Sequence, residues 1–294
     1  MGGIDWGIQA NKTLGEIGNF VGKKFWRDYS NGSDSNEGTE AGPVKTLQEA
    51  IDRTVSGRGD MIICKPGGEP VTTPVLFNKS GIMVVASQYG ANPFSIGELF
   101  SIYAAEALVD SPVATVTERC LIQGLGFAGR DSRTAFGFGA ALLVGNLPDD
   151  AGPFGVHLKG CRFPKWGLDN SKGIALMGPS DIRVEACGFE GGGADFDAGI
   201  YLQGAAQNVD LINNIFRDCT YAIETGVFAG GGPEAIIMGN IMQGSKFLNC
   251  PSALTGLVCD NWSPYSTNAT TYNDTVTNME TLGLSITGNH YSEE

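Results

Sequence analysis

Apolar and polar residues alternate in six short segments of the chain from residue 120 onward. In each segment the alternation is followed by a small residue, then by Cys, Asn or Leu, and two positions later by an aromatic residue or Met. Alternation with a period of two is typical of β-strands. The segments are Cys120–Phe127, Val156–Phe163, Ile182–Phe189, Val209–Phe216, Ala235–Met242 and Leu284–Tyr291.

These segments recur at regular spacing. The Cys, Asn or Leu position falls at residues 125, 161, 187, 214, 240 and 289, so the successive gaps are 36, 26, 27, 26 and 49. Further strand-like runs interleave with the segments at Ala141–Gly145, Ile174–Gly178, Ile200–Gly204 and Ala222–Gly226. Short strands repeated with such a period, without helical segments between them, are typical of a solenoid. The pattern predicts an all-β chain folded as a parallel β-helix.

The spacing predicts which side chains stack from rung to rung. Residues Cys161, Cys187, Asn214 and Asn240 are expected to form one ladder at a bend, with Asn289 as a candidate extension. Phe163, Phe189 and Phe216 are expected to form a second ladder. Stacked Asn side chains hydrogen-bond along a solenoid axis, and stacked aromatic rings fill its interior. The gap of 36 residues predicts a loop in one rung, and the gap of 49 residues fits either two rungs or one rung with a large excursion.

Three N-terminal runs resemble the opening of pectate-lyase-like right-handed parallel β-helix proteins: Lys24–Thr39, Pro43–Asp52 and Gly59–Gly67. The resemblance extends over residues 24 to 245 and implies a short helix that caps the end of the solenoid. We predict this helix at Thr46–Arg53, where Thr46 is a candidate N-cap and Glu49 completes a capping box. The superfamily includes lyases, hydrolases, phage tailspikes and virion proteins, so the resemblance predicts a fold and leaves the chemistry open.

Three regions of the chain are distinguished by their patterns. Residues 24–249 are predicted to form the capped β-helix, and residues 250–294 a C-terminal cap or oligomer-contact segment, because a solenoid needs an atypical closing unit. Residues 1–23 lack the repeat and are expected to be an anchoring arm or, alternatively, a frayed or cap-packing segment. The candidate partner-binding residues of this arm are Ile4, Trp6, Ile8, Phe20 and Val21. Ile96–Leu108 also breaks the repeat and favours a projecting loop or helix around Ala104–Leu108.

Net charge and cysteine content restrict the kinds of partner and site that the chain can have. The formal net charge is −13 and the sequence pI is about 4.6, which disfavours binding to nucleic acid or to an anionic membrane. We find no signal peptide pattern and no run of 18 apolar residues, so a chain made in the host cytoplasm is expected.

Seven cysteines without CxxC spacing indicate buried thiols. The oxygen-rich run Asp28–Glu40 is explained better by turns than by calcium binding, and no metal site or cofactor is predicted.

The sequence offers only weakly supported candidates for catalytic residues. Glycoside hydrolysis requires two carboxylates, and Asp195 and Asp197 are the most suggestive pair because residues i and i+2 of a strand share a face. A solvated loop is the alternative for this Gly-rich run. Arg162, Arg183 and Arg217 are not expected to form a cluster, and His157 and His290 are interpreted as structural or surface residues. We therefore favour a protein that is not an enzyme.

The leading hypothesis is a phage virion structural protein, located in the virion. It would be a capsid decoration or cement protein that forms a homotrimer and binds the major capsid protein through residues 1–23. The alternative is a tailspike-type polysaccharide depolymerase, hydrolase or lyase, or a glycan-binding protein that contacts a cell-surface glycan. A bacterial surface adhesin is a third hypothesis.

Overall fold

A computed structural model gives the structure of the protein. It describes residues 22–87, 100–105, 108, 111–129, 140–145, 152–164, 172–178, 180–191, 196–203, 207–226, 234–243, 245–249, 255–263, 285–287 and 290–291. Apart from one short helix, the regular structure of these residues consists of strands and agrees with the predicted all-β class.

The strands form three sheets. Sheet A has ten strands, in the order β1 (Lys24–Arg27), β2 (Met61–Cys64), β5 (Ile82–Ala86), β8 (Cys120–Gln123), β11 (His157–Lys159), β14 (Ser180–Glu185), β17 (Gln207–Ile212), β20 (Glu234–Met238), β23 (Thr255–Cys259) and β25 (Ser285–Thr287). Sheet B has nine strands, β3 (Gly67–Val71), β6 (Phe100–Ala104), β9 (Gly126–Ala128), β12 (Arg162–Pro164), β15 (Gly188–Glu190), β18 (Ile215–Arg217), β21 (Ile241–Gln243), β24 (Trp262–Ser263) and β26 (His290–Tyr291). Sheet C has seven strands, β4 (Val75–Phe77), β7 (Ala114–Val116), β10 (Ala140–Gly145), β13 (Lys172–Met177), β16 (Phe196–Gln203), β19 (Cys219–Thr225) and β22 (Lys246–Asn249).

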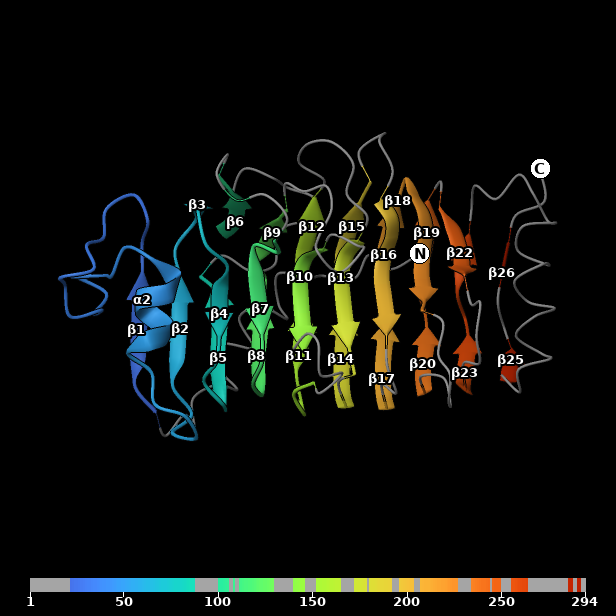
Figure 1. The fold of residues 1–294 in the computed structure, drawn as a ribbon, viewed down its shortest axis with the longest axis horizontal. Helices are drawn as coiled ribbons and strands as arrows, with labels where there is room; N and C mark the ends of the chain where they lie inside the picture. Colours follow the sequence, from blue (N-terminus) through green and yellow to red (C-terminus); the bar gives the residue numbers. More distant parts are fainter. Residues whose placement is uncertain are drawn as a thin grey trace, which may run out of the picture.

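The chain is a right-handed parallel β-helix, as predicted. Each strand pairs in parallel with the strand of the same sheet in the next rung, so β11 pairs with β14 and β14 with β17. Figure 1 shows the rungs following one another along the long axis, from the blue N-terminal end to the red C-terminal end. The apolar core fills the interior between the three sheets and is continuous from Phe25 in the first rung to Val258 in β23.

The helix α2 (Leu47–Asp52) lies at the N-terminal end of the solenoid, where it contacts β1, β2 and β4. It buries Leu47, Ala50 and Ile51 against the first rung. Thr46 is its N-cap, and its hydroxyl accepts the backbone N–H of Glu49 at 3.3 Å. The expected capping box is only half formed. The backbone N–H of Thr46, which the Glu49 side chain was expected to accept, is accepted by Asp34 Oδ1 at 2.8 Å instead.

The bend between sheets A and B contains a left-handed residue followed by a buried residue of the ladder. Ala186 has a φ of 52° and Asn213 a φ of 56°, and they precede Cys187 and Asn214. Asn214 Oδ1 accepts the N–H of Cys187 at 2.9 Å, and Asn240 Oδ1 accepts the N–H of Asn214 at 2.9 Å. The small residue of the sequence repeat is therefore the position that turns the chain.

The Asn ladder continues at Asn261, which the spacing analysis missed. Its Oδ1 accepts the N–H of Asn240 at 3.0 Å, and its amide donates to the carbonyl of Ile237 at 3.0 Å. The gap of 49 residues therefore contains two rungs, one with β23 and β24 and the next with β25 and β26. Asn289 lies outside the described residues.

A column of phenylalanine rings fills the interior below sheet B. The ring centroids of Phe163 and Phe189 are 4.8 Å apart, as are those of Phe189 and Phe216, and Phe127 extends the stack at 5.6 Å from Phe163. A Cβ at Gly173 would lie 2.8 Å from the ring of Phe189. Sheet C therefore requires glycine where the ring column passes it.

One predicted element is different in the structure. The expected loop or helix around Ala104–Leu108 begins within β6, which pairs with β3 and β9 as part of sheet B. The run Phe100–Ala104 alternates buried and half-buried residues, as expected of a strand with one face in the core, whereas Glu106 and Ala107 of the predicted segment lie outside the described residues.

Candidate functional site

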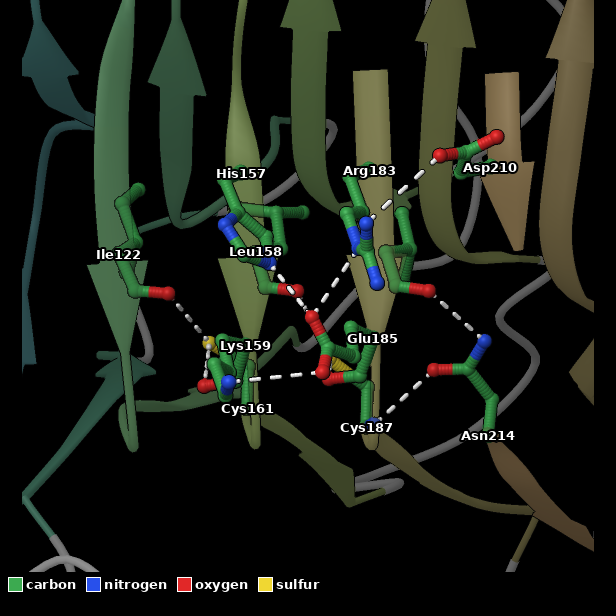
Figure 2. A network of polar contacts seen from close by, with 11 residues as sticks. Ile122, His157, Leu158, Lys159, Cys161, Arg183, Glu185, Cys187, Asp210 and Asn214 are labelled. Carbon is green, nitrogen blue, oxygen red and sulfur yellow. Dashed lines mark hydrogen bonds and ion pairs between the residues drawn. The ribbon is translucent and has the colours of Figure 1, made fainter. Parts of the chain in front are cut away.

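Five ionisable side chains gather on the outer face of sheet A, and we call them the sheet A cluster. Their interior neighbours Leu158, Val184 and Leu211 are fully buried, and side chains alternate between the two faces of a strand. The register places Lys159 beside Glu185, and His157, Arg183 and Asp210 in one row across three rungs. The members of the cluster, shown in Figure 2, are His157, Lys159, Arg183, Glu185 and Asp210.

Glu185 is the centre of the sheet A cluster. Its Oε2 lies 3.0 Å from His157 Nε2 and 3.0 Å from Arg183 Nε, and its Oε1 lies 3.4 Å from Lys159 Nζ. Arg183 Nη1 also lies 4.0 Å from Asp210 Oδ2. The side chain of Glu185 is 19% exposed and that of Arg183 is 44% exposed, so the cluster is open to solvent on the side of the arginine.

Burial and neighbouring charges set the protonation of this cluster. Burial raises the pKa of Glu185, but Lys159, Arg183 and His157 together lower it more, so the net pKa lies below its ordinary value. Burial also lowers the pKa of His157, and the attraction of Glu185 only partly opposes this shift. At neutral pH, Glu185 is therefore a carboxylate, and the neutral imidazole of His157 donates its Nε2 proton to it.

The Asn ladder fixes the end of strand β14, on which Glu185 lies. Ala186 follows Glu185 in the left-handed conformation, and the N–H of Cys187 is then held by Asn214. The amide of Asn214 also donates to the carbonyl of Val184 at 3.0 Å. Figure 2 shows Asn214 to one side of the cluster, with its contact to Cys187 drawn as a dashed line. The carboxylate of Glu185 is thus presented by a strand end whose backbone is held on both sides.

This arrangement offers binding groups rather than an assembled acid–base pair. A general acid of a glycosidase needs a raised pKa and a second carboxylate nearby. Glu185 has a lowered pKa, and the imidazole Nε2 of His157 is occupied by Glu185. The half-exposed Lys159, Arg183 and Asp210 present charged donors and acceptors to a polar ligand.

Arginines also gather on sheet B, contrary to the sequence prediction. Arg162 and Arg217 both bind Glu190, which lies on the strand between theirs. Arg162 and Arg217 are two rungs apart and lie in neighbouring rows of the sheet face. Their sequence separation is therefore not a whole number of rungs, and the spacing did not reveal that they share a partner. Arg183 lies on sheet A, so the prediction that the three arginines form no cluster is wrong for two of them.

The structure places the other predicted residues as follows. Asp197 is in β16, whereas Asp195 lies outside the described residues, as do the candidate partner-binding residues Ile4, Trp6, Ile8, Phe20 and Val21. The ladder residues Cys161, Cys187, Asn214 and Asn240 lie at the bend between sheets A and B, and Phe163, Phe189 and Phe216 lie in the interior. The six cysteines of the described residues are buried and free, and burial raises the pKa of the Cys64 thiol to about 12.

Sequence reasoning considered most members of the sheet A cluster singly and did not predict their proximity. The signal was present, because His157 and Arg183 are 26 residues apart and Arg183 and Asp210 are 27 residues apart. These intervals equal the rung period. Aligning the outward positions of successive rungs, in addition to the inward ones, would have found the cluster.

Other site types have no counterpart in the part of the chain that the structure describes. In these residues no group of three or more His, Cys, Asp or Glu side chains is arranged to hold a metal ion. No helix within them is long and apolar enough to cross a membrane.

Comparison with known proteins gives weak structural similarities. No protein-family model matches the sequence, and no curated protein matches it significantly. A rhamnogalacturonan lyase is 16% identical with a TM-score of 0.42, and the alignment covers 92% of this chain and 63% of the lyase. Pectate lyase Pel9A is 13% identical with a TM-score of 0.49, covering 95% of this chain and 79% of that one. ORF18 of Geobacillus virus E2 is 14% identical with a TM-score of 0.43, and the alignment covers 100% of this chain and 65% of ORF18. The chain thus spans less than two thirds of the length of the lyase named first, and these similarities assign no function to it.

Proposed function

We propose that this chain is a phage virion structural protein, a capsid decoration or cement protein that binds the shell as a homotrimer. The observation that carries this proposal is the pairing of the carboxylates on the solenoid faces. Glu185 contacts three donors on sheet A, Glu190 contacts two arginines on sheet B, and Glu224 contacts Lys172 on sheet C. Carboxylates held in this way stiffen a surface and are poorly suited to proton transfer.

The sequence resemblance to a superfamily with virion members supports the location in the virion. A continuous core and hydrogen-bonded ladders make the solenoid a rigid body, which suits a protein that stabilises a shell through shape and buried area. In this proposal residues 1–23 contact the major capsid protein, with Trp6 and Phe20 as the principal apolar contacts. The solenoid would then stand on the shell surface, with its N-terminal rung nearest the arm.

The proposal is tested by the copy number of the chain in purified phage particles, measured by quantitative mass spectrometry against the major capsid protein. A simple ratio to the capsid protein is expected of a decoration protein. A copy number typical of a tail component would contradict the capsid location, and absence from particles would overturn the virion role. Light scattering of the purified chain tests the trimer separately.

The binding role of the arm is tested with shells that lack this protein. A variant without residues 1–23 is expected to keep the circular dichroism of the solenoid and to lose binding to the shells. Trp6→Ala is expected to weaken binding, whereas Phe154→Ala, at a side chain that is 68% exposed, serves as a matched control. Undiminished binding of the truncated chain would remove the arm from the proposal.

A second candidate function, glycan binding or cleavage, is favoured by the sheet A cluster. Lyase chemistry uses a basic residue to remove a proton next to a uronate carboxylate, and Lys159, His157 and Arg183 lie together there. This candidate predicts unsaturated products, visible by ultraviolet absorbance, when the chain is incubated with an acidic polysaccharide. Loss of this activity in Arg183→Ala would support it, and no product from any acidic polysaccharide would exclude lyase activity on those substrates.

A further inference from the structure

Ile236 places a large apolar side chain on the outer face of sheet A, where it is 41% exposed. Along β20 the flanking residues Ala235 and Ile237 are buried in the core, so alternation directs Ile236 and Met238 outward. Among the described residues, Ile236 is one of four large hydrophobic side chains that are exposed. A single exposed apolar side chain is ordinary on a protein surface, so its neighbours decide whether it belongs to a contact surface.

The neighbours of Ile236 on the adjoining rungs are apolar on one side and belong to the sheet A cluster on the other. Leu257 of β23 pairs with Ile236 and is half-buried. Ile212 and Met238 are paired in the next row of the same face, and Ile236 itself pairs with Asp210, a member of the cluster. We call the apolar residues the sheet A patch, which lies directly next to the cluster and consists of Ile212, Ile236, Met238 and Leu257.

Positive and negative charges nearly cancel on the outer face of sheet A, although the whole chain carries −13. The exposed or half-buried charged side chains of its strands are three cations and four carboxylates, which sum to −1. A chain with a large net negative charge repels its own copies, so copies approach most easily through a face on which the charges cancel. These side chains are Lys24, Lys159 and Arg183, and Asp181, Glu185, Asp210 and Glu234.

The sheet A cluster contains groups of both signs that can pair between copies. Arg183 is 44% exposed and Asp210 is 33% exposed, and their contact within one copy is long, at 4.0 Å. Copies that surround an axis parallel to the solenoid meet at equal heights. Neighbouring rungs are about 4.8 Å apart, so Arg183 of one copy can reach Asp210 of the next copy. A face with this arrangement is complementary to itself.

We propose that the outer face of sheet A, from the sheet A cluster to the sheet A patch, is the surface at which copies of this chain meet. The inference rests on the homotrimer of the proposed function and adds which face turns toward the threefold axis. Ile236 and Leu257 form the apolar centre of the contact, and Arg183 with Asp210 its charged part. Burial of the apolar side chains supplies affinity, and the charges of both signs fix the register of the copies.

The test is the oligomeric state of the full chain, measured by analytical ultracentrifugation over a range of concentrations. The wild-type chain is expected to be a trimer. Ile236→Lys places a charge at the centre of the contact and is expected to raise the dissociation constant of the trimer at least about tenfold. Leu76→Lys is the matched control, because Leu76 is 44% exposed on β4 of sheet C, and it is expected to leave the dissociation constant unchanged. Circular dichroism verifies that both variants are folded.

Ile236→Cys tests the same contact without adding a charge. Equal positions lie close together at a threefold axis, so this variant is expected to form disulfide-linked dimers on air oxidation, visible on a non-reducing gel. The six cysteines of the described residues are buried, and the wild-type chain shows the background linking of all native cysteines. Leu76→Cys is the control for linking by chance collision and is expected to stay at this background.

The outcomes separate this inference from the proposed function. A trimer that is as stable in Ile236→Lys as in Leu76→Lys, or equal linking of the two cysteine variants, would overturn the inference and leave the homotrimer with another face as its contact. A monomeric wild-type chain would overturn both the inference and the homotrimer, and would leave the face to the glycan of the second candidate function. The virion role is decided independently of these results, by the copy number in particles.

Discussion

The side-chain oxygen of Asn240 accepts the backbone N–H of Asn214 from one rung away, at 2.9 Å, and both residues are fully buried. Asn214 makes the same contact with Cys187 in the preceding rung. Each amide also donates to a strand carbonyl, Val184 for Asn214 and Leu211 for Asn240. The bend between sheets A and B is therefore held by side chains that replace the backbone ladder where the strands end.

Asn214→Ala is expected to destabilise the chain by about 3 kcal/mol, because it orphans the buried N–H of Cys187, which costs about 1–3 kcal/mol, and also removes the hydrogen bond to the carbonyl of Val184. Urea unfolding followed by circular dichroism measures the change. Asn31→Ala is the control, since Asn31 is exposed and its side chain makes only long contacts with Asp28, at 3.3 and 3.5 Å. Equal stability of the two variants would contradict a supporting role for the ladder.

The fold could be predicted largely from the sequence because a solenoid repeats the same inward positions. Stacked residues such as Phe163 and Phe189 recur after one rung, and the recurrence is visible without knowledge of the third dimension. Asn261 was missed because its rung is shorter than the others, with a sequence separation of 21 from Asn240. The strand β6 was missed because it lies in a region where the repeat is interrupted.

The site could be predicted only in part. Contacts between outward side chains depend on which rows become neighbours, and Arg162 and Arg217 meet at Glu190 from different rows. Long side chains reach diagonally across a sheet. Their partners therefore do not lie at the same position of the repeat, and the sequence separation of two partners is not a whole number of rungs. Asp34, a loop residue 12 positions earlier in the chain, takes the place of Glu49 as the partner of the Thr46 backbone N–H, and no local sequence pattern predicts this contact.

Phe189→Ala is expected to destabilise the chain by about 3–5 kcal/mol, the usual loss for a phenylalanine removed from a packed core. The cavity would separate the rings of Phe163 and Phe216, each 4.8 Å from that of Phe189. Phe154→Ala is the matched control, because that ring is 68% exposed, and we expect a change within about 0.5 kcal/mol. Thermal unfolding of both variants decides the comparison, and a small effect at Phe189 would mean that the column tolerates gaps.

The pKa of His157 is expected below its ordinary value of 6.5, because burial outweighs the attraction of Glu185. Below pH 6.5 the unfolded chain then binds more protons than the folded chain, so this group's contribution to stability is lost as the pH falls through the folded pKa. The lowered pKa of Glu185 acts in the same direction below its ordinary value of 4.5. Stability measured against pH should therefore fall on acidification, first through His157 and then through Glu185.

Nuclear magnetic resonance titration checks the first step directly, since the chain has two histidines and His157→Gln assigns the signals. The same variant should flatten the stability curve just below pH 6.5 and leave the part below pH 4.5 in place. A midpoint for His157 above 6.5 would show that Glu185 dominates, and the sign of the effect would reverse.

The buried pair of Arg27 and Glu69 joins the first rung to the capping helix, because Glu69 also accepts the N–H of Leu47 at 3.1 Å. Glu69→Leu is expected to cost about 3–5 kcal/mol, since it leaves the guanidinium of Arg27 buried without a counter-charge. The double variant Arg27→Met with Glu69→Leu should recover most of this loss, because replacing both partners removes the orphaned charge. Urea unfolding of the single and double variants measures the coupling.

Glu49→Ala, which breaks a partly exposed pair with Arg53, is the control with an expected loss of at most about 1 kcal/mol. A double variant that is less stable than Glu69→Leu alone would show that the pair itself, rather than the avoidance of a lone charge, stabilises the N-terminal end.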